Sequence, residues 1–443
     1  MKGRASRLII CAVVASLFAV ASAKPTPTEI PSPSQTQAKQ PPQQLKITEY
    51  RLPPDERAKA EALYKTRTVL YLFGMVFGIV VLWTLLKLRA APAFRDRAER
   101  ISQNGFVQAL IFVPLLMLLV AVISLPIDIY QHHIARAYGL SVQGWVSWAA
   151  DWCKAEAISL VITVLAVYGL FRIIRKSPQR WWFYFWLVTL PFVVLLIFAA
   201  PVILDPMFNK FEPLEKTQPQ LVSEIEKVIR RGGLNIPRDH MFEMEASEKV
   251  TTYNAYVTGI GATKRVVVWD TTSRDMTIPE TLFVFGHEMG HYVLNHIYKG
   301  LAFYSGMTLL GFWLGRKIVL AMLARWGEAW HIRGISDLAA LPVLMLALAL
   351  LTLLAEPIGN AFSRYQEHQA DIYGLEVTHG LFPDNGEVAA SAFQKLGEKS
   401  YDYPMPNPLL VFWSYDHPSI RERILFSLHY DPWRTPAGPK YVR

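Results

Sequence analysis

Residues 182–204 read WFYFWLVTLPFVVLLIFAAPVIL, a run of 23 residues without a charged side chain. A helix of about 20 such residues is long enough to cross roughly 30 Å of hydrocarbon. Over all 443 residues the chain is 52% hydrophobic and only 18% charged, whereas soluble domains carry about 25% charged residues. Because the missing charge is concentrated in such runs, the composition excludes a soluble globule, a disordered chain and a coiled coil. It predicts a protein built around membrane helices.

Five further apolar runs extend this pattern on both sides of the first. They are Thr68–Leu88, Phe106–Ile127, Ala157–Ile174, Leu301–Gly315 and Leu338–Ala355. We therefore expect a mainly α fold, a polytopic bundle of membrane helices. Four spans belong to an N-terminal membrane domain over residues 61–204, and two more, at about 301–315 and 338–355, lie within a second domain over residues 205–443.

The N-terminal residues 1–23 have the order of a secretory signal peptide. Basic residues precede an apolar run over residues 8–20, and small residues lead up to Ala23, after which cleavage is expected. An uncleaved anchor is the alternative, although the apolar run is shorter than a span needs. Residues 24–60 are rich in Pro and Gln and are expected to form a disordered tether. The two cysteines of the chain exclude a disulfide scaffold.

Basic residues cluster in three loops beside the spans. They follow the first span, separate the third from the fourth, and separate the last two: Arg89, Arg95, Arg97, Arg100, Arg172, Arg175, Lys176, Arg180, Arg316, Lys317, Arg325 and Arg333. If each apolar run crosses once, all three loops lie on the same side, which the positive-inside rule makes cytoplasmic. Residues 128–156 and 205–296 then lie outside. The net charge of +9 is thus explained by membrane topology, with no need for a nucleic-acid partner.

The less apolar stretch 205–280 is predicted to be a small α/β insert. Thr217–Arg231 has apolar residues at helical spacing and ends at a Gly pair. Three strand candidates follow, Met241–Ala246, Thr251–Val257 and Arg265–Trp269, with glycines at a turn between the last two. The middle candidate could offer a free edge on which a peptide pairs in extended form, or it could be an ordinary hairpin strand.

The segment His287-Glu-Met-Gly-His291 carries the most specific chemical signal. On a helix, positions i and i+4 share one face, so both imidazoles can reach one metal ion, and Glu288 can polarise a water on that ion. In a chain of this composition the pattern is expected by chance about once in a hundred sequences. The alternative, two histidines packed in a core, has less support because the surrounding helix is suitably apolar.

A hydrolytic zinc site needs three protein ligands and an open position for water. Leu294 and Ile297 stand where an extended form of the motif would have Gly and His, so the third ligand must come from elsewhere. Glu367 and Asp371 lie one turn apart on a predicted helix over Ser363–Val377. One could coordinate the metal while the other accepts an imidazole N–H or exchanges a proton. Considered alone, such a pair is more often a solvated helix face.

The runs FGHEMGHYVLNH (285–296) and NAFSRYQEHQAD (360–371) resemble the two signature helices of the type I CAAX prenyl proteases, which are integral-membrane zinc metallopeptidases. The resemblance covers roughly residues 60–430. Other matching pieces occur in the order of the family: Ser124-Leu-Pro126, Pro206-Met-Phe-Asn-Lys-Phe211, Asn254-Ala-Tyr256, Val268-Trp-Asp270, and His417-Pro418 with Arg423.

This resemblance implies a small α/β, gluzincin-like zinc-metallopeptidase domain and assigns roles within it. His287, His291 and Glu367 would bind one Zn²⁺ per chain, and Glu288 would be the catalytic base. Asp371 would assist as a proton donor. The residues implied to contact substrate or the developing oxyanion are Asn254, His417 and Arg423.

The expected function is that of an integral-membrane zinc metalloendopeptidase, which hydrolyses peptide bonds through a zinc-bound water. Its partners would be a peptide or protein substrate, free or membrane-anchored, and the lipid bilayer. The expected place is a bacterial inner membrane, crossed several times, with the catalytic domain on the periplasmic side. Eukaryotic members of the family differ in having seven membrane helices and no cleaved signal.

A zinc-dependent membrane quality-control chaperone or a transporter, without proteolysis, is the alternative function. A transporter needs ionisable residues at mid-membrane. The centres of Phe106–Ile127, Trp182–Leu204 and Leu338–Ala355 have none, which disfavours transport.

Overall fold

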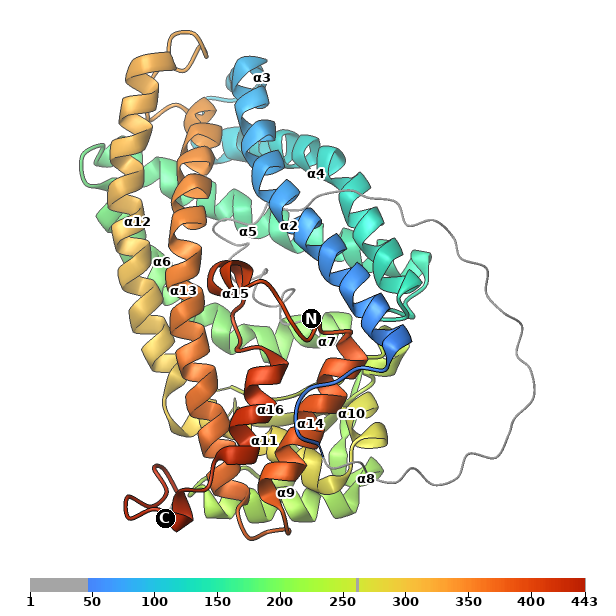
Figure 1. The fold of residues 1–443 in the computed structure, drawn as a ribbon. Coiled ribbons are helices and arrows are strands. Elements are labelled where there is room, and N and C mark those ends of the chain that lie inside the picture. Colours follow the sequence, from blue (N-terminus) through green and yellow to red (C-terminus); the bar gives the residue numbers. More distant parts are fainter. Residues whose placement is uncertain (1–46, 260–262, 443) are drawn as a thin grey trace.

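The computed structural model describes residues 47–259 and 263–442 and shows a mainly helical chain (Figure 1). The expected signal peptide and most of the expected tether lie outside the described residues. The α-helices are α2 (Pro54–Lys87), α3 (Ala90–Ile101), α4 (Gly105–Ala137), α5 (Trp145–Lys176), α6 (Trp181–Ala199), α7 (Asp205–Phe208), α8 (Leu214–Thr217), α9 (Pro219–Arg231), α10 (Asp270–Asp275), α11 (Ile278–Val293), α12 (His296–Trp326), α13 (Leu341–Thr378), α14 (Asn385–Ser400), α15 (Pro408–Ser414) and α16 (Ile420–His429). The strands are β1 (Phe211–Pro213), β2 (Met241–Met244), β3 (Ala255–Thr258) and β4 (Arg265–Trp269).

Among the described residues, five helices are long and apolar enough to cross a membrane: α2, α4, α5, α12 and the helix that includes α13. A sixth crossing is made if α6 and the segment after it are counted as one span, although they are bent by 44°. A π-helical turn at Ala200–Leu204 lies at this bend, and such turns are a common cause of kinks. The six expected spans thus correspond to five single helices and one bent pair.

The membrane helices follow one another around the bundle. α2 packs against α13, α13 against α12, α12 against α6, α6 against α5, and α5 against α4, while α3 joins α4 back to α2. Figure 1 shows α3 and the α12–α13 connection at one end of the molecule and α11, α14 and α16 at the other. The long helices therefore run between two ends of the molecule. One end carries the three basic loops and is called the basic end, and the other carries the α/β domain.

The three basic loops meet at the end of the bundle away from the α/β domain. Arg89 Nε donates to the Ala329 carbonyl at 3.1 Å, and Arg175 Nε donates to the Ser336 carbonyl at 3.3 Å. At the opposite end, the Val142 N–H donates to the Lys249 carbonyl at 3.0 Å and so joins the α4–α5 loop to the α/β domain. The three loops lie at one end of the bundle, as the prediction that they share one side requires.

Buried apolar residues gather in two main cores at the two ends of the long helices. The core at the basic end is formed by α2, α3, α4, α5, α6, α12 and α13. The core at the other end surrounds α11 and is sealed by α9, α14 and α16. There Phe283 of α11 meets Phe393 of α14 edge to face, with ring centroids 5.2 Å apart, a favoured geometry for aromatic pairs.

A four-stranded sheet covers α11, in the order β1-β2-β4-β3. β2 and β4 are parallel, and the outer pairs are antiparallel. The three predicted strands are present, two of them shorter than expected. β1 was not predicted, because its three residues include a proline and show no alternation. Among the described residues β3 pairs only with β4, so it has the free edge that the sequence allowed.

Helix α13 differs from the prediction of a span followed by a separate helix. It continues without interruption through Pro357, from the basic end into the second core. An internal proline removes one backbone hydrogen bond, but Pro357 is buried and α13 packs along α12, α2 and α11. The carboxylates of α13 therefore belong to one continuous helix that runs from the basic end into the second core. Helix α2 likewise begins at Pro54, inside the segment expected to be tether.

Candidate active site

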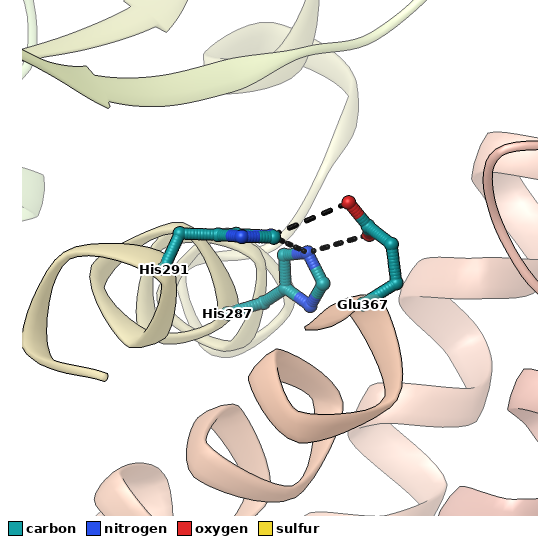
Figure 2. Close-up of side chains that lie close together, drawn as sticks. All are labelled: His287, His291 and Glu367. Carbon is teal, nitrogen blue, oxygen red and sulfur yellow. Dashed lines mark hydrogen bonds and ion pairs between the residues drawn. The ribbon is translucent and has the colours of Figure 1, made fainter. Parts of the chain in front are cut away.

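His287, His291 and Glu367 lie together where α11 crosses α13 (Figure 2). One ligand atom from each can be chosen so that all lie within 4.8 Å of one another. The two Nε2 atoms are 3.2 Å apart. The Glu367 carboxylate oxygens lie 3.3 Å from His287 Nε2 and 3.4 Å from His291 Nε2. The side chains predicted to be metal ligands thus converge on one point.

Small residues allow the two helices to approach closely enough for this. A Cβ on Gly374 of α13 would lie 3.0 Å from the His287 backbone nitrogen, and one on Gly290 of α11 would lie 3.0 Å from Tyr373 Cβ. Helix α11 begins at a capping box in which Thr277 and Glu280 bond each other's backbone, an arrangement that stabilises a helix start. The backbone of α11, which carries both histidines, is therefore fixed at its N-terminus and where it crosses α13.

The hydrogen bonds of His287 determine which nitrogen faces the cluster. His287 Nδ1 lies 2.8 Å from Asp371 Oδ1. A carboxylate only accepts, so in the neutral ring Nδ1 carries the proton and Nε2 presents a lone pair. Burial alone would lower the pKa of His287, but Asp371 and Glu367 outweigh burial and raise it. The surroundings therefore favour a positive charge at this point.

His291 is oriented by a second chain of hydrogen bonds. Gln369 Oε1 accepts from His296 Nε2 at 3.2 Å, which leaves His296 Nδ1 as an acceptor. His291 Nδ1 lies 3.1 Å from this atom and must donate to it. His291 Nε2 is then the nitrogen with the lone pair. His296 is buried and positions a predicted ligand, a role for which no spacing rule gave a signal.

These residues fit a zinc ion on three observations. In their neutral forms the two histidines point lone pairs at each other across 3.2 Å, which is unfavourable unless a cation lies between them. Two ligands at about 2.0–2.1 Å from a tetrahedral zinc lie roughly 3.4 Å apart, close to the three distances measured here. Finally, Glu367 Oε2 is buried without a hydrogen-bond partner, and a metal ion would satisfy it.

Asp371 and Arg423 form a buried pair on the far side of His287. Arg423 Nε donates to Asp371 Oδ2 at 3.0 Å, and Arg423 Nη2 donates to Asp371 Oδ1 at 2.5 Å. Asp371 is only 1% exposed. The guanidinium also lies over the Phe393 ring, 4.2 Å from its centroid. Both oxygens of Asp371 are thus occupied, one of them by the imidazole that it orients.

Glu288, Asn254 and His417 line one cavity of about 670 Å³ together with His287 and Arg423. His417 Nε2 lies 3.1 Å from Glu367 Oε1. Burial alone would lower the pKa of His417, but the charge of Glu367 and the bond to Asp416 raise it to about 9.

Asn254 stands directly before β3, the edge strand. Its backbone is fixed by Thr272, whose hydroxyl accepts from the Asn254 N–H and donates to the Asn254 carbonyl, both at 2.8 Å. All the predicted site residues are thus brought into one region, although they come from the residue before β3, α11, α13, the segment before α16, and α16 itself. The cavity also has a wall from α2 that the sequence gave no reason to include.

Comparisons with known proteins match both halves of the chain. Residues 215–427 match the model of peptidase family M48, and residues 34–210 match the model described as the CAAX prenyl protease N-terminal region with five membrane helices. A protein called uncharacterized metalloprotease YhfN, from Bacillus subtilis, is 38% identical over 84% of this chain and 85% of its own length.

CAAX prenyl protease 1 of Saccharomyces cerevisiae is 26% identical over 86% of this chain and 89% of its own length. The crystal structure of Ste24p from S. mikatae has a similar fold, with a TM-score of 0.72 and 24% sequence identity over 85% of this chain and 89% of that one. The similarity therefore extends over the membrane helices as well as the residues around the cluster.

Proposed function

Because the chain belongs to peptidase family M48 and is a multi-pass membrane metalloendopeptidase, we propose that it holds zinc at His287, His291 and Glu367 and uses Glu288 as its general base. Its fold matches that of the expected membrane helix bundle with a small metallopeptidase domain. The observation that carries the proposal is the convergence of two Nε2 atoms and a buried carboxylate within hydrogen-bonding distance of one another. A chaperone or transporter without proteolysis is not favoured.

Glu288 is next in sequence to His287 and lines the same cavity. When bound, zinc would acidify a water molecule and polarise the scissile carbonyl. Glu288 takes a proton from the attacking water and delivers it to the leaving nitrogen. Asp371 acts through His287: it holds the Nδ1 proton and so keeps Nε2 directed at the metal position, and Arg423 in turn orients Asp371. We therefore assign both as positioning residues, in place of the proton donor and the substrate contact expected from the resemblance.

The substrate peptide would lie extended along β3. This strand has a free edge among the described residues, and Asn254 and the HExxH helix are its immediate neighbours. Backbone pairing at such an edge gives affinity that does not depend on sequence. Asn254 and His417, on the wall of the cavity, would contact the peptide beside the scissile bond.

The substitution Glu288→Gln tests the reaction. It should lower hydrolysis of a fluorogenic peptide library by about 10²–10⁴-fold, the usual contribution of a general acid–base group. Zinc content, measured by atomic emission, and the thermal unfolding midpoint should stay those of the original chain. Glu224→Gln, a partly exposed residue of α9 that does not line the cavity, is the control and should retain full activity. Near-normal cleavage by Glu288→Gln would overturn the assignment.

We further propose that the catalytic end faces the periplasm of a bacterial inner membrane. The support is the gathering of the three basic loops at the opposite end, which the positive-inside rule makes cytoplasmic. In a chain with Cys153→Ser, a membrane-impermeant maleimide should label Lys210→Cys in intact spheroplasts and should reach Lys176→Cys only after lysis. The reverse pattern would place the active site in the cytoplasm.

A further inference from the structure

The cavity has a polar wall that the mechanism above does not use. Tyr64, Arg67 and Tyr71 are spaced by three and four residues, so they lie on one face of α2. All three line the same cavity as His287 and Glu288. A membrane helix thus contributes a cation to the space in which a peptide would be cleaved.

This wall is attached to the segment after α14. The Tyr64 ring stacks on Tyr403 with centroids 5.0 Å apart, and the Tyr64 hydroxyl accepts from the Asn407 N–H at 2.9 Å. Arg67 Nη1 donates to the Ser400 carbonyl at 3.4 Å. These contacts hold the face of α2 at a set position relative to the cavity.

Arg67 differs from Arg423, the other arginine of the cavity, in having, within the part of the chain that the structure describes, no carboxylate bound to its guanidinium. The guanidinium of Arg423 is occupied by Asp371. In contrast, no carboxylate of the described residues lies within 4.0 Å of Arg67, and its one hydrogen bond is long. Asp402, on the same wall, acts on Arg67 through space but forms no ion pair with it. Since a guanidinium has five N–H donors, Arg67 retains donors for a ligand.

The planar fork of a guanidinium matches a carboxylate, which it can bind through two parallel hydrogen bonds. A peptide offers carboxylates at its free C-terminus and on Asp and Glu side chains. We propose that Arg67 is the subsite for a carboxylate of the peptide substrate and thereby sets the distance from that carboxylate to the scissile bond. This inference rests on the proposed peptidase function and adds a determinant of specificity to it.

Binding to a chain that cannot cleave tests the subsite without an activity assay. The full-length Glu288→Gln protein in detergent would be titrated by calorimetry with N-acetyl-trialanine as the free acid, with the same peptide as its C-terminal amide, and with an amidated analogue whose central residue is aspartate. The free acid should bind about tenfold or more tightly than the amide, as expected for a hydrogen bond to a charged group. If the aspartate analogue binds as tightly as the free acid, any carboxylate of the peptide serves. If it binds only as weakly as the amide, the carboxylate at the C-terminus is required.

Variants of the wall identify the residue responsible. Arg67→Gln should equalise the affinities for acid and amide, and Arg67→Lys should keep part of the difference, because it retains the charge without the fork. Asp402→Asn removes the competing acid and should increase the preference. Arg57→Gln, on the exposed part of α2, is the matched control and should change nothing. Unfolding midpoints check that each variant is folded.

Two results would overturn the subsite: equal binding of acid and amide by the parent protein, or an undiminished preference in Arg67→Gln. Failure of the proposed function has a different signature. If the chain with Glu288 intact cleaves no member of a peptide library while the acid preference persists, the reaction is wrong and the subsite stands. If library members are cleaved equally with free and amidated ends and binding shows no preference, the subsite alone is wrong.

Discussion

The two ends of the molecule each contain a buried Arg–Asp pair. At the catalytic end Arg423 binds Asp371, and at the basic end Arg95 binds Asp337. In both pairs each residue is less than a tenth exposed. The pairs differ in what the carboxylate contacts next, and this difference separates a positioning role in chemistry from a role in folding.

At the basic end, the other contacts of Asp337 are to backbone N–H groups. Asp337 accepts from the Ala339 N–H at 3.0 Å and from the Arg333 N–H at 2.9 Å, while Arg95 also donates to the His331 carbonyl at 3.4 Å. All of these bonds fix the turn that leads into α13. At the catalytic end the aspartate contacts an imidazole whose other nitrogen faces two potential metal ligands. A buried ion pair is thus not in itself a sign of function.

Asp337→Asn should produce the largest change, and only in stability. Removing one charge of a buried pair leaves Arg95 with only the more exposed Asp96 as an acidic partner, and breaking a buried pair typically costs about 3–5 kcal/mol. The free energy of unfolding, measured by urea titration in detergent, should fall by this amount. Zinc affinity and the specific activity of the folded fraction should not change.

The control for this variant is Asp96→Asn. Asp96 also pairs with Arg95, but its side chain is 42% exposed, and exposed ion pairs contribute about 1 kcal/mol or less. Equal destabilisation by the two variants would contradict the view that burial of Asp337 makes its pair important. A loss of zinc from Asp337→Asn would remove the contrast between the two ends.

Much of this arrangement was predictable from local sequence. The HExxH spacing placed His287 and His291 on one face of a helix, and the i,i+4 pair Glu367 and Asp371 indicated a ligand with a supporting carboxylate. The side shared by the basic loops followed from counting apolar runs. The positions of the four helix side chains could be predicted because helical periodicity fixes which side chains face the same direction, whatever the rest of the fold does.

Other features depend on contacts between distant segments and gave no local signal. Arg67 comes 220 positions before His287 and reaches the cavity only because α2 packs along α13 and meets the segment after α14. His296 follows the motif, but its role depends on Gln369 of another helix. The span at 338–355 and the helix over Ser363–Val377 were predicted separately, but tertiary packing makes them one helix through Pro357. The role of Arg423 also had no local signal, because it depends on the hydrogen bonds between its guanidinium and Asp371.

Asp371→Asn should change the chemistry, and in free energy this change should be smaller than the loss of stability in Asp337→Asn. Asparagine can still accept from His287 Nδ1, yet it lacks the charge that holds Arg423 and strengthens the imidazole as a ligand. Partners that orient metal ligands typically contribute 10–100-fold to metal affinity or activity, equivalent to about 1.4–2.7 kcal/mol. Chelator competition should show zinc affinity reduced within this range, with kcat reduced in parallel at saturating zinc. Because Arg423 loses its partner, some stability is lost as well, but Asp337→Asn loses stability without any change in zinc affinity. Unaltered zinc affinity and kcat in Asp371→Asn would mean that the two pairs are equivalent and that the catalytic-end pair only supports the fold.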